Sequence, residues 1–383
     1  MIYGGGDRLS MKRKIIEIIY AIFRLLPIKK DTVLIFSYYG EQYSGSPKYI
    51  GKYLQKNSNL KIVWAFVNNN GHKDVEGKKV RYGHLNYYRY LATAGTVITN
   101  YRMTDEFKKR SEQKYIQTWH SSLRLKMIEK DAETTLPPDY VKMAKNDSKQ
   151  IDYLLAGSQK SREIFEHSFW FNGKIVNSGT PQCDILFEDR QSAAKKVFEY
   201  YNIPQDCHIV MYAPTFRKNH DMSVYDLDAQ AVLKALKSKF GGEWYLLMRL
   251  HPHLINSAGY FKYTDKIIKA TDYDDVQELL CATDVLITDY SAIMFDFVLT
   301  KRPCFLYTPD LENYIKNDRK LYFDIEQLPF DSFKEKKEIV EGIIDFSKEE
   351  YIKKVDKFMK EIGSFDDGKA CERVYDLLKE VKK

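Results

Sequence analysis

The segment that decides the fold is Asp284-Val-Leu-Ile-Thr-Asp-Tyr-Ser-Ala-Ile-Met-Phe-Asp-Phe297. Its apolar start predicts a buried strand, and its polar centre predicts a turn that opens a helix at Ser291. A helix that begins directly after a strand points backbone N–H groups at an anion. The segment therefore predicts one unit of a parallel α/β sheet, with an anion bound at the strand end.

Apolar runs alternate with helical patterns along most of the chain, which is typical of parallel α/β sheets. The chain has 383 residues, which is long for one domain and favours two. We expect two Rossmann-like domains that face a central cleft, over residues 31–186 and 187–345. Residues 1–30 form an N-terminal extension and amphipathic helix in this prediction, and residues 346–383 form helices that pack across both domains. The predicted strands are 32–37, 61–67, 96–99, 115–119, 153–156, 208–213, 244–250, 266–269, 285–288 and 304–307.

The composition narrows the class of partner. The formal charge of +7 and the pI near 8.8 favour an anionic partner without naming it. Nucleic acid is not favoured, because the sequence has no zinc-finger spacing, arginine-rich block or aromatic RNA-binding signature. The five cysteines are scattered and odd in number, which predicts reduced thiols in a cytosolic protein.

The N-terminal segment has the pattern of an amphipathic helix with basic flanks. Apolar residues recur at helical spacing from Ile15 to Leu26, and lysine or arginine precedes and follows this run. The run is shorter than the roughly 20 apolar residues that a membrane-spanning helix needs. It fits a helix that lies on an anionic membrane surface through residues 12–30. A helix packed on its own domain is the alternative interpretation.

Four side chains follow predicted strands and are candidates for chemistry: His120, Arg217, His251 and Ser291. In parallel sheets, ligands bind beyond the carboxyl ends of the strands, so we expect these residues to converge. A histidine there can accept a proton from a hydroxyl group, and another can donate hydrogen bonds to phosphate oxygens. Arginine can bind phosphate through two hydrogen bonds. The convergence predicts a phosphate-handling transferase.

Several other sites are excluded by their missing motifs. The sequence has no G-x-G-x-x-G after the first strand, no P-loop, no G-x-S-x-G elbow and no cysteine pair at zinc spacing. Asp289 and Asp296 do not form a tight Asp-x-Asp cluster, so we expect structural or ribose-binding roles for them. No metal or cofactor is predicted.

An ordered set of motifs resembles the CDP-glycerol glycerophosphotransferases, a family that includes the wall teichoic acid primases and polymerases. The resemblance covers about residues 36–314. The motifs are Gln42-Tyr-Ser-x-x-Pro47-Lys48, Trp119-His120, Gly179-x-Pro181, Met211-Tyr-Ala-Pro-Thr-Phe-Arg217, Arg249-x-His251-Pro252 and Thr288-Asp-Tyr-Ser-x-x-Met-Phe-Asp296.

The resemblance implies a GT-B fold, with an acceptor-side first domain and a donor-nucleotide second domain. It implies a peripheral enzyme of the cytoplasmic membrane face that transfers glycerol phosphate, or a related polyol phosphate, from CDP-glycerol or CDP-ribitol to a lipid-linked saccharide acceptor and releases CMP. His120 becomes the base on the acceptor hydroxyl, and His251 the partner of the pyrophosphate. The implied substrate-binding residues are Arg217, Thr215, Thr288, Asp289, Ser291, Ala292, Pro47, Lys48 and Gly179.

The chain departs from the family pattern at several positions. Ser121-Ser122 follows His120 where many members have Gly-Thr or Gly-Ser, and Gln182-Cys183 stands where Arg-Asn is common. Acceptor or polyol specificity is therefore open. The sequence shows no additional N-terminal domain, which favours a short product. A glycosyltransferase or nucleotide-sugar epimerase of the same fold remains an alternative, as does a non-catalytic membrane-surface protein that binds an anionic ligand.

Overall fold

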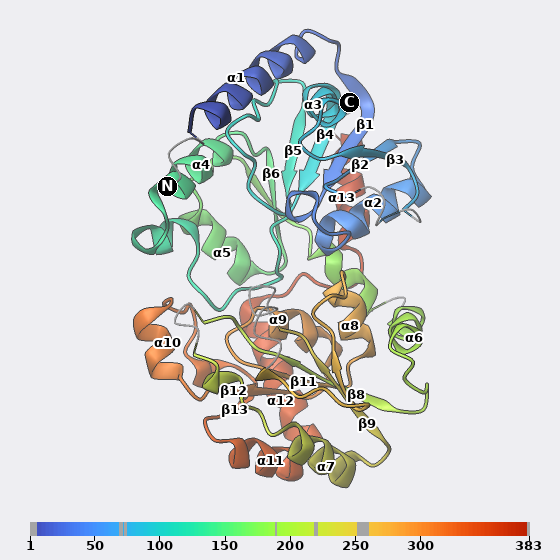
Figure 1. Cartoon of the computed structure of the whole chain (residues 1–383), viewed down its shortest axis with the longest axis vertical. Helices are drawn as coiled ribbons and strands as arrows, with labels where there is room; N and C mark the ends of the chain where they lie inside the picture. The colour runs from blue at the N-terminus through green and yellow to red at the C-terminus, as the bar shows by residue number, and fades with distance from the viewer. Residues whose placement is uncertain are drawn as a thin grey trace.

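The computed structural model describes residues 6–68, 72, 75–187, 190–217, 221–250 and 260–380. They form two parallel α/β domains, one above the other in Figure 1. The first sheet has seven strands in the order β3-β2-β1-β4-β5-β6-β7, and the second has six in the order β10-β9-β8-β11-β12-β13. The prediction of two parallel sheets that face each other is confirmed.

The elements of the first domain follow the predicted rhythm. The strands are β1 (Lys29–Phe36), β2 (Lys61–Phe66), β3 (Lys78–Arg81), β4 (Ala94–Thr99), β5 (Lys114–Gln117), β6 (Tyr153–Ala156) and β7 (Lys174–Asn177). The helices are α1 (Gly6–Phe23), α2 (Gly45–Asn57), α3 (Leu85–Thr93), α4 (Pro138–Ser148) and α5 (Gln159–Ser168).

The second domain repeats the same alternation. Its strands are β8 (His208–Ala213), β9 (Trp244–Met248), β10 (Ile267–Lys269), β11 (Val285–Thr288), β12 (Cys304–Tyr307) and β13 (Asp331–Phe333). Its helices are α6 (Arg190–Tyr200), α7 (Ala229–Phe240), α8 (Val276–Ala282), α9 (Ile293–Phe297), α10 (Leu311–Asn317), α11 (Lys336–Asp345) and α12 (Lys348–Ile362). The last helix, α13 (Ala370–Glu380), belongs spatially to the first domain (Figure 1).

Both faces of the first sheet are buried, which explains why its central strands read as continuous apolar runs. In β1, Val33 and Ile35 point into one core with Trp64, whereas Leu34 and Phe36 point into the other. Successive side chains of a strand alternate between faces, so helices must cover both sides. The predicted strands with apolar runs are therefore all present.

Three strands were missed by the sequence analysis: β3, β7 and β13. Each lies at an edge of its sheet. Their residues are mostly exposed or half-buried, so they carry no apolar run. Edge strands pair with a neighbour on one side only and are less buried, so their sequences lack the apolar run that marks a central strand.

The C-terminal segment connects the two domains. Helix α12 contributes Val355 and Phe358 to the core of the second domain. Helix α13 then packs Val374 and Leu377 against the outer face of the first sheet, next to α2. Asp184 accepts hydrogen bonds from the first backbone N–H groups of α13. These bonds fix the start of α13 where the chain crosses back from the second domain to the first.

Helix α1 packs on the first domain beside α3. Tyr20 is the buried anchor: it stacks edge-on against Tyr88, and its hydroxyl donates to the Lys108 carbonyl. The opposite face exposes Ile15, Ile18, Ile22 and, just beyond the helix, Leu25. No helix in the described part of the chain is both long and apolar enough to cross a membrane.

Candidate active site

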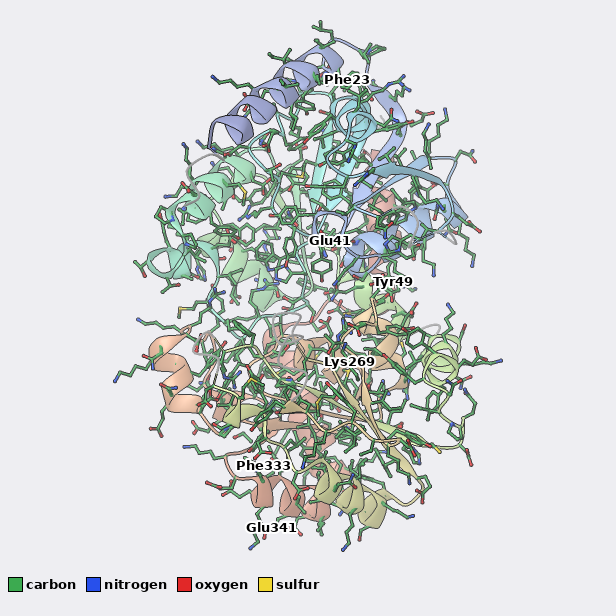
Figure 2. The ribbon with its side chains drawn as sticks, in the orientation of Figure 1. Phe23, Glu41, Tyr49, Lys269, Phe333 and Glu341 are labelled. Atoms are coloured by element: carbon green, nitrogen blue, oxygen red, sulfur yellow. The ribbon has the colours of Figure 1, made fainter. Side chains whose placement is uncertain are left out.

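A cavity of about 580 Å³ lies between the domains, where the carboxyl ends of both sheets meet. Figure 2 labels Tyr49 at the junction of the two domains, where its hydroxyl donates to Asp275 of the second domain. The first domain contributes residues that follow β1, β4 and β5, and the second contributes residues that follow β8, β9 and β11. Such a position is where doubly wound sheets bind ligands.

His120 lines this cavity, and the backbone before it is strained. Trp119 has a φ of 55°, a left-handed conformation that is unfavourable for a bulky residue. The Trp119 amide donates to the side-chain oxygen of Gln117, and its ring lies 4.5 Å from the His120 ring. The strained turn therefore directs the imidazole away from the sheet and into the cavity.

The surroundings of His120 keep its imidazole neutral. The ring is open to the cavity but enclosed by protein on its other sides, and this poor solvation lowers its pKa to about 4. The positive charges of Arg124 and Lys126 act in the same direction, against a hydrogen bond to the Asn100 backbone. A neutral ring that donates one N–H to a carbonyl has a free lone pair on its other nitrogen, which can accept a proton.

The turn after β11 forms the opposite wall. Ser291 and Ala292 line the cavity. Helix α9 begins at Ile293, two residues later than predicted, and its N-cap position is Ala292 rather than Ser291. The Ser291 hydroxyl is close to the Ile293 amide, at 3.5 Å, so it remains near the helix start without occupying the cap position.

Thr288 and Asp289 support this turn from behind, and neither lines the cavity. Thr288 Oγ1 donates to the Ala213 carbonyl at 2.7 Å and ties β11 to β8. Asp289 accepts hydrogen bonds from the Thr215 amide, at 2.8 and 3.0 Å. Thr215 itself lines the cavity, and no described residue is a hydrogen-bond partner of its Oγ1. Of these three candidates, Thr215 is the one placed to contact a ligand.

Arg217 is enclosed by protein, with 1% of its surface exposed. Its guanidinium binds Asp310 through two hydrogen bonds of 2.7 and 3.0 Å and lies 2.8 Å from Asp289. The Tyr290 and Tyr314 rings cover its faces. In this conformation Arg217 positions the β8 and β11 turns, and its predicted phosphate contact stays a prediction.

The other substrate-binding candidates lie at the domain boundary. Lys48 is buried and binds Asp275 and Glu278 of the second domain. Pro47 is buried in the first turn of α2. Gly179 adopts a φ of 78° beside the Phe365 carbonyl, where a Cβ would be 3.1 Å from that oxygen, and it does not line the cavity. His251 lies outside the described residues.

Asp296 is the hydrogen-bond centre of the domain boundary. One carboxylate oxygen accepts from the backbone amide and the hydroxyl of Ser122, at 3.2 and 2.6 Å. The other accepts from the side-chain amides of Gln182 and Gln277, both at 2.7 Å. Asp296 therefore joins the His120 loop, the interdomain connection and α8. Its predicted structural role fits this placement.

The sequence analysis did not single out the cavity residues Tyr38, Tyr101 and Arg319, or Asn100, whose backbone is a hydrogen-bond partner of His120. Asn100 and Tyr101 follow β4 directly. The strand-end rule that selected His120 could therefore have found them. Arg319 follows α10, and no local pattern marks its approach to the cavity.

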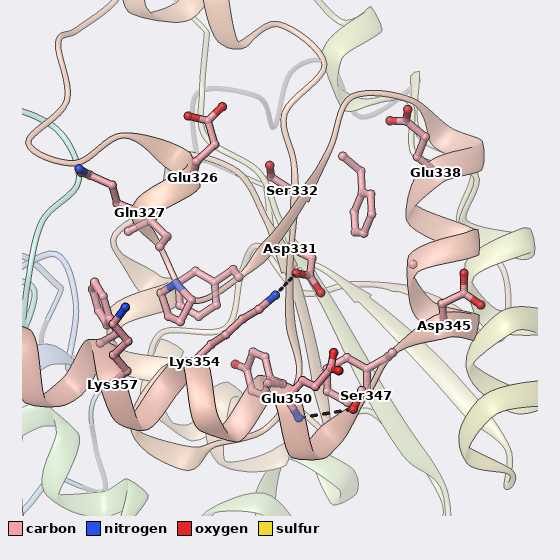
Figure 3. Close-up of a pocket in the computed structure, with 18 of the residues that line it drawn as sticks. Glu326, Gln327, Asp331, Ser332, Glu338, Asp345, Ser347, Glu350, Lys354 and Lys357 are labelled. Atoms are coloured by element: carbon pink, nitrogen blue, oxygen red, sulfur yellow. Dashed lines mark hydrogen bonds and ion pairs between the residues drawn. The ribbon is translucent and has the colours of Figure 1, made fainter.

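A second, larger cavity of about 890 Å³ lies at the far edge of the second domain, between β13, α11 and α12 (Figure 3). Its walls carry Glu326, Asp345 and Glu350, and Lys354 is paired with Asp331. An acidic surface disfavours phosphate ligands, so this cavity does not compete with the first one. Nowhere in the described ranges does a group of three or more His, Cys, Asp or Glu side chains come together in a way that could hold a metal ion.

Two facing α/β domains with a histidine-bearing interdomain cavity define a GT-B-like transferase. The chain belongs to the CDP-Glycerol:Poly(glycerophosphate) glycerophosphotransferase family, whose sequence profile matches residues 18–380. The recognition of this family from the sequence is confirmed.

Individual relatives agree with this membership. A teichoic acid poly(glycerol phosphate) polymerase from Staphylococcus epidermidis is 32% identical over 373 residues, which are 93% of this chain and 51% of that protein. The chain thus spans about half of that polymerase. A polymerase of the same description from Bacillus spizizenii is 29% identical and is covered over 97% of its length, with 96% of this chain. The structure of a variant of the wall teichoic acid polymerase TagF soaked with CDPG superposes with a TM-score of 0.84 at 29% identity and 98% coverage of both chains.

Proposed function

We propose that this chain transfers glycerol phosphate, or a related polyol phosphate, from a CDP-activated donor to a lipid-linked saccharide acceptor at the cytoplasmic membrane face, and releases CMP. The product belongs to teichoic acid or to a phosphate-containing capsular polymer. The observation that carries this proposal is the neutral His120 ring, which faces an interdomain cavity with one ring nitrogen free to accept a proton. Family membership supports the donor class.

The reaction follows from the two walls of the cavity. The acceptor hydroxyl gives its proton to the free nitrogen of His120, and its oxygen attacks the phosphorus that carries the polyol. A new P–O bond forms to the acceptor as the bond to the CMP phosphate breaks. The Thr215 hydroxyl and the Ser291 turn lie opposite His120, in position to hold the departing phosphate.

The donor assignment has a second support. CDPG was soaked into crystals of a TagF variant that shares this fold over almost the whole chain. In this chain the strand ends of the second domain line the interdomain cavity, with Arg249 and Thr271 on its wall. Arg249 is partly tied down, because one guanidinium nitrogen donates to the carbonyls of Ala270 and Tyr273.

The test is acceptor-dependent CMP release by the purified chain, supplied in turn with CDP-glycerol, CDP-ribitol and UDP-sugars, with and without a lipid-linked disaccharide. We expect CMP from one CDP-polyol only when the acceptor is present. His120→Ala should reduce the rate at least about 1,000-fold and leave donor affinity nearly intact. His84→Ala is the matched control, because His84 is exposed at the start of α3, outside the cavity.

Each alternative function has its own outcome in this experiment. Turnover of a UDP-sugar, with no CMP from either CDP-polyol, would assign the chain to the glycosyltransferases or epimerases. Donor binding without any turnover would favour a non-catalytic binding protein. Undiminished CMP release by His120→Ala would remove His120 from the mechanism.

A further inference from the structure

The segment of the first domain that carries His120 begins and ends at residues with left-handed backbone. Trp119 has a φ of 55° and Glu129 has a φ of 53°. Neither residue is a glycine, so these conformations persist only where surrounding groups hold them. Residues 120–128 are all described and form no helix or sheet strand, apart from the bridge between Lys126 and Leu321. Contacts from outside the segment must therefore fix its two ends.

Arg102 contacts both ends of this segment. It lies three residues beyond β4, and 2% of its surface is exposed. Its guanidinium carbon is 5.6 Å from the centre of the Trp119 ring, and its Nη2 atom donates to Glu129 Oε2 at 2.6 Å. One buried side chain thus joins the two strained residues that bound the His120 segment.

The guanidinium is itself held in one orientation. Its Nη1 atom donates to Asp147 Oδ2, near the end of α4, at 3.0 Å, and its carbon lies 4.4 Å from the centre of the Phe169 ring. The other carboxylate oxygen of Glu129 accepts from the Tyr140 hydroxyl at 2.6 Å. Arg102, Glu129 and Asp147 are all almost fully buried, so the loss of one charge would leave the others uncompensated. These groups therefore keep one another in place.

Trp119 connects this buried network to the cavity. Its ring is buried, and the ring centre lies 4.5 Å from that of His120. Arg102, Glu129 and Asp147 do not line the cavity, so they cannot contact a ligand bound there. Any effect of Arg102 on the reaction must therefore pass through the Trp119 ring to the His120 ring beside it.

We infer that Arg102 is a positioning residue for the proposed transfer: it fixes the Trp119 turn so that the His120 imidazole stays in the cavity wall, with one ring nitrogen toward the acceptor hydroxyl. The Asn100 backbone holds the other ring nitrogen. The inference rests on the proposed function for the role of His120 as the base, whereas the position of the ring is testable without turnover. A role in stability alone is the competing explanation, and it predicts no effect on the ring in the folded chain.

The first test separates turnover from stability. Arg102→Met should lower kcat about 100-fold, because a displacement of the base by about 1 Å is enough for such a loss, and it should change KM for CDP-glycerol less than about threefold. Arg302→Met is the matched control. It also removes a largely enclosed guanidinium, one that donates to the carbonyls of Leu280 and Cys281 in the second domain. Both variants are assayed at a temperature where circular dichroism shows them folded, and equal losses of kcat would overturn the inference.

Arg102→Lys keeps the test decisive if Arg102→Met fails to fold. Lysine retains a positive charge beside Glu129 and Asp147, but its compact ammonium group cannot bind both carboxylates and stack on Trp119 as the planar guanidinium does. We expect a smaller loss of stability than in Arg102→Met and a fall in kcat of about tenfold. Full activity of Arg102→Lys would show that the charge alone suffices, which contradicts a positioning role.

A titration of the His120 ring measures its position directly. The full chain is labelled with nitrogen-15 in its histidine rings, and the signal that disappears in His120→Ala belongs to His120. Because poor solvation lowers the pKa of His120 to about 4, its signal should stay constant between about pH 8 and 5.5 in the unmodified chain. In Arg102→Lys the ring should move toward solvent and titrate nearer the ordinary value of about 6.5, although Arg124 and Lys126 remain beside it.

The outcomes of this titration are separate from those of the activity assay. A constant His120 signal in Arg102→Lys would leave Arg102 with a role in stability alone. A signal that already titrates near 6.5 in the unmodified chain would show that the network does not hold the ring in the cavity wall. If the unmodified chain releases no CMP with any donor, the proposed function fails, and the titration still decides whether Arg102 positions the ring.

Discussion

Lys48 Nζ lies 2.6 Å from Asp275 Oδ2, across the boundary between the two domains, and both side chains are almost fully buried. Asp275 also accepts a hydrogen bond from the Tyr49 hydroxyl at 2.7 Å, and its other oxygen accepts from the Gln277 amide at the start of α8. Glu278 completes the site at 2.9 Å from Lys48 Nζ. Helix α2 of one domain is thus tied to α8 of the other behind the cavity.

The first prediction concerns this interdomain pair. Lys48→Met leaves Asp275 and Glu278 buried without their cation, which typically destabilises a protein by about 3–5 kcal/mol. We expect a lower midpoint in urea unfolding and a loss of CMP release that follows weakened domain docking. Lys56→Met, at the exposed end of α2, should change neither. If Lys48 contacts the donor instead, Lys48→Met would raise the donor KM at unchanged stability.

The pH dependence of turnover should report the neutral state of His120. Its pKa in the folded chain is about 4, below the ordinary value, so the base stays unprotonated as the pH falls through 6. The acid limb of kcat/KM should therefore lie well below the pKa of a solvated histidine. An acid limb near 6.5 would show that His120 is solvated during turnover.

Arg124 provides a sharper version of this test. It is buried under the Phe165 ring, and removal of its charge by Arg124→Met should move the acid limb upward. The limb should stay below that of a solvated histidine, because poor solvation is the larger cause of the shift and remains. Arg162→Met on α5, whose guanidinium pairs with Glu166, is the control and should leave the limb in place.

The sequence predicted the central strands because both of their faces are buried, and it predicted His120 because strand ends are where such sheets bind ligands. It could not assign Lys48 or Arg217 to their partners. Asp275 lies 227 residues after Lys48, and Asp310 lies 93 residues after Arg217. Such pairs form only when the two domains dock or when a distant loop folds back onto the strand ends. Neither event leaves a local pattern in the sequence.

The start of α9 shows a different limit of sequence reasoning. Ser291 is a favourable cap residue, and its position after β11 predicted that it would cap the helix, but the N-cap position is Ala292. In the structure the Asp289 carboxylate accepts from the Tyr290 and Thr215 amides, so the turn is closed before Ser291 is reached. The helix therefore starts later. Tertiary hydrogen bonds set the first residue of α9, and the cap propensity of Ser291 alone could not predict it.

Asp296→Asn should weaken the domain boundary. The carboxylate accepts from four donors, two of which are the side-chain amides of Gln182 and Gln277. An asparagine at this position presents an N–H group to one pair of donors and leaves them unpaired, which costs about 1–3 kcal/mol. The urea midpoint should fall accordingly. Asp356→Asn, an exposed residue paired with Lys301, should change it by less than about 0.5 kcal/mol.

Asp366 should make the interdomain connection less stable as the pH rises from about 4 to about 8. Burial raises the pKa of its carboxyl to about 8, against hydrogen bonds from Thr180. Because this folded-state pKa exceeds the unfolded one, the contribution of Asp366 to stability declines as the pH rises from about 4 through 8. Asp366→Asn removes this titration, so the variant should gain on the order of 1 kcal/mol relative to the unmodified chain at pH 9.

The adjacent Asp367 is the natural control for Asp366. Its hydrogen bond to Arg373 lowers its pKa, so its contribution is present at neutral pH and is lost as the pH falls. Asp367→Asn should therefore flatten the acid side of the stability profile and leave the alkaline side unchanged. Melting temperatures from about pH 2 to about pH 9 would measure both effects. An unaltered fall in stability between about pH 4 and 8 in Asp366→Asn would contradict the prediction for Asp366.

The exposed face of α1 should bind the chain to anionic membranes. Tyr20 anchors the helix on the first domain, while Ile18 and Ile22 remain 62% and 58% exposed. Lys14, in the middle of the helix, and Lys29, at the start of β1, are exposed and can contact anionic headgroups. Burial of an isoleucine is worth about 1.5–3 kcal/mol, so Ile18→Glu with Ile22→Glu should lower vesicle partitioning more than about tenfold.

The measurement is co-sedimentation of the full chain with phosphatidylglycerol-rich vesicles and with neutral phosphatidylcholine vesicles. Ile344→Glu is the matched control, because Ile344 is 48% exposed on α11, at the opposite end of the molecule (Figure 1). The double variant should stay in the supernatant while retaining CMP release with a water-soluble acceptor, since α1 lies outside the cavity. Equal sedimentation of the double variant and the control would remove this face from membrane binding.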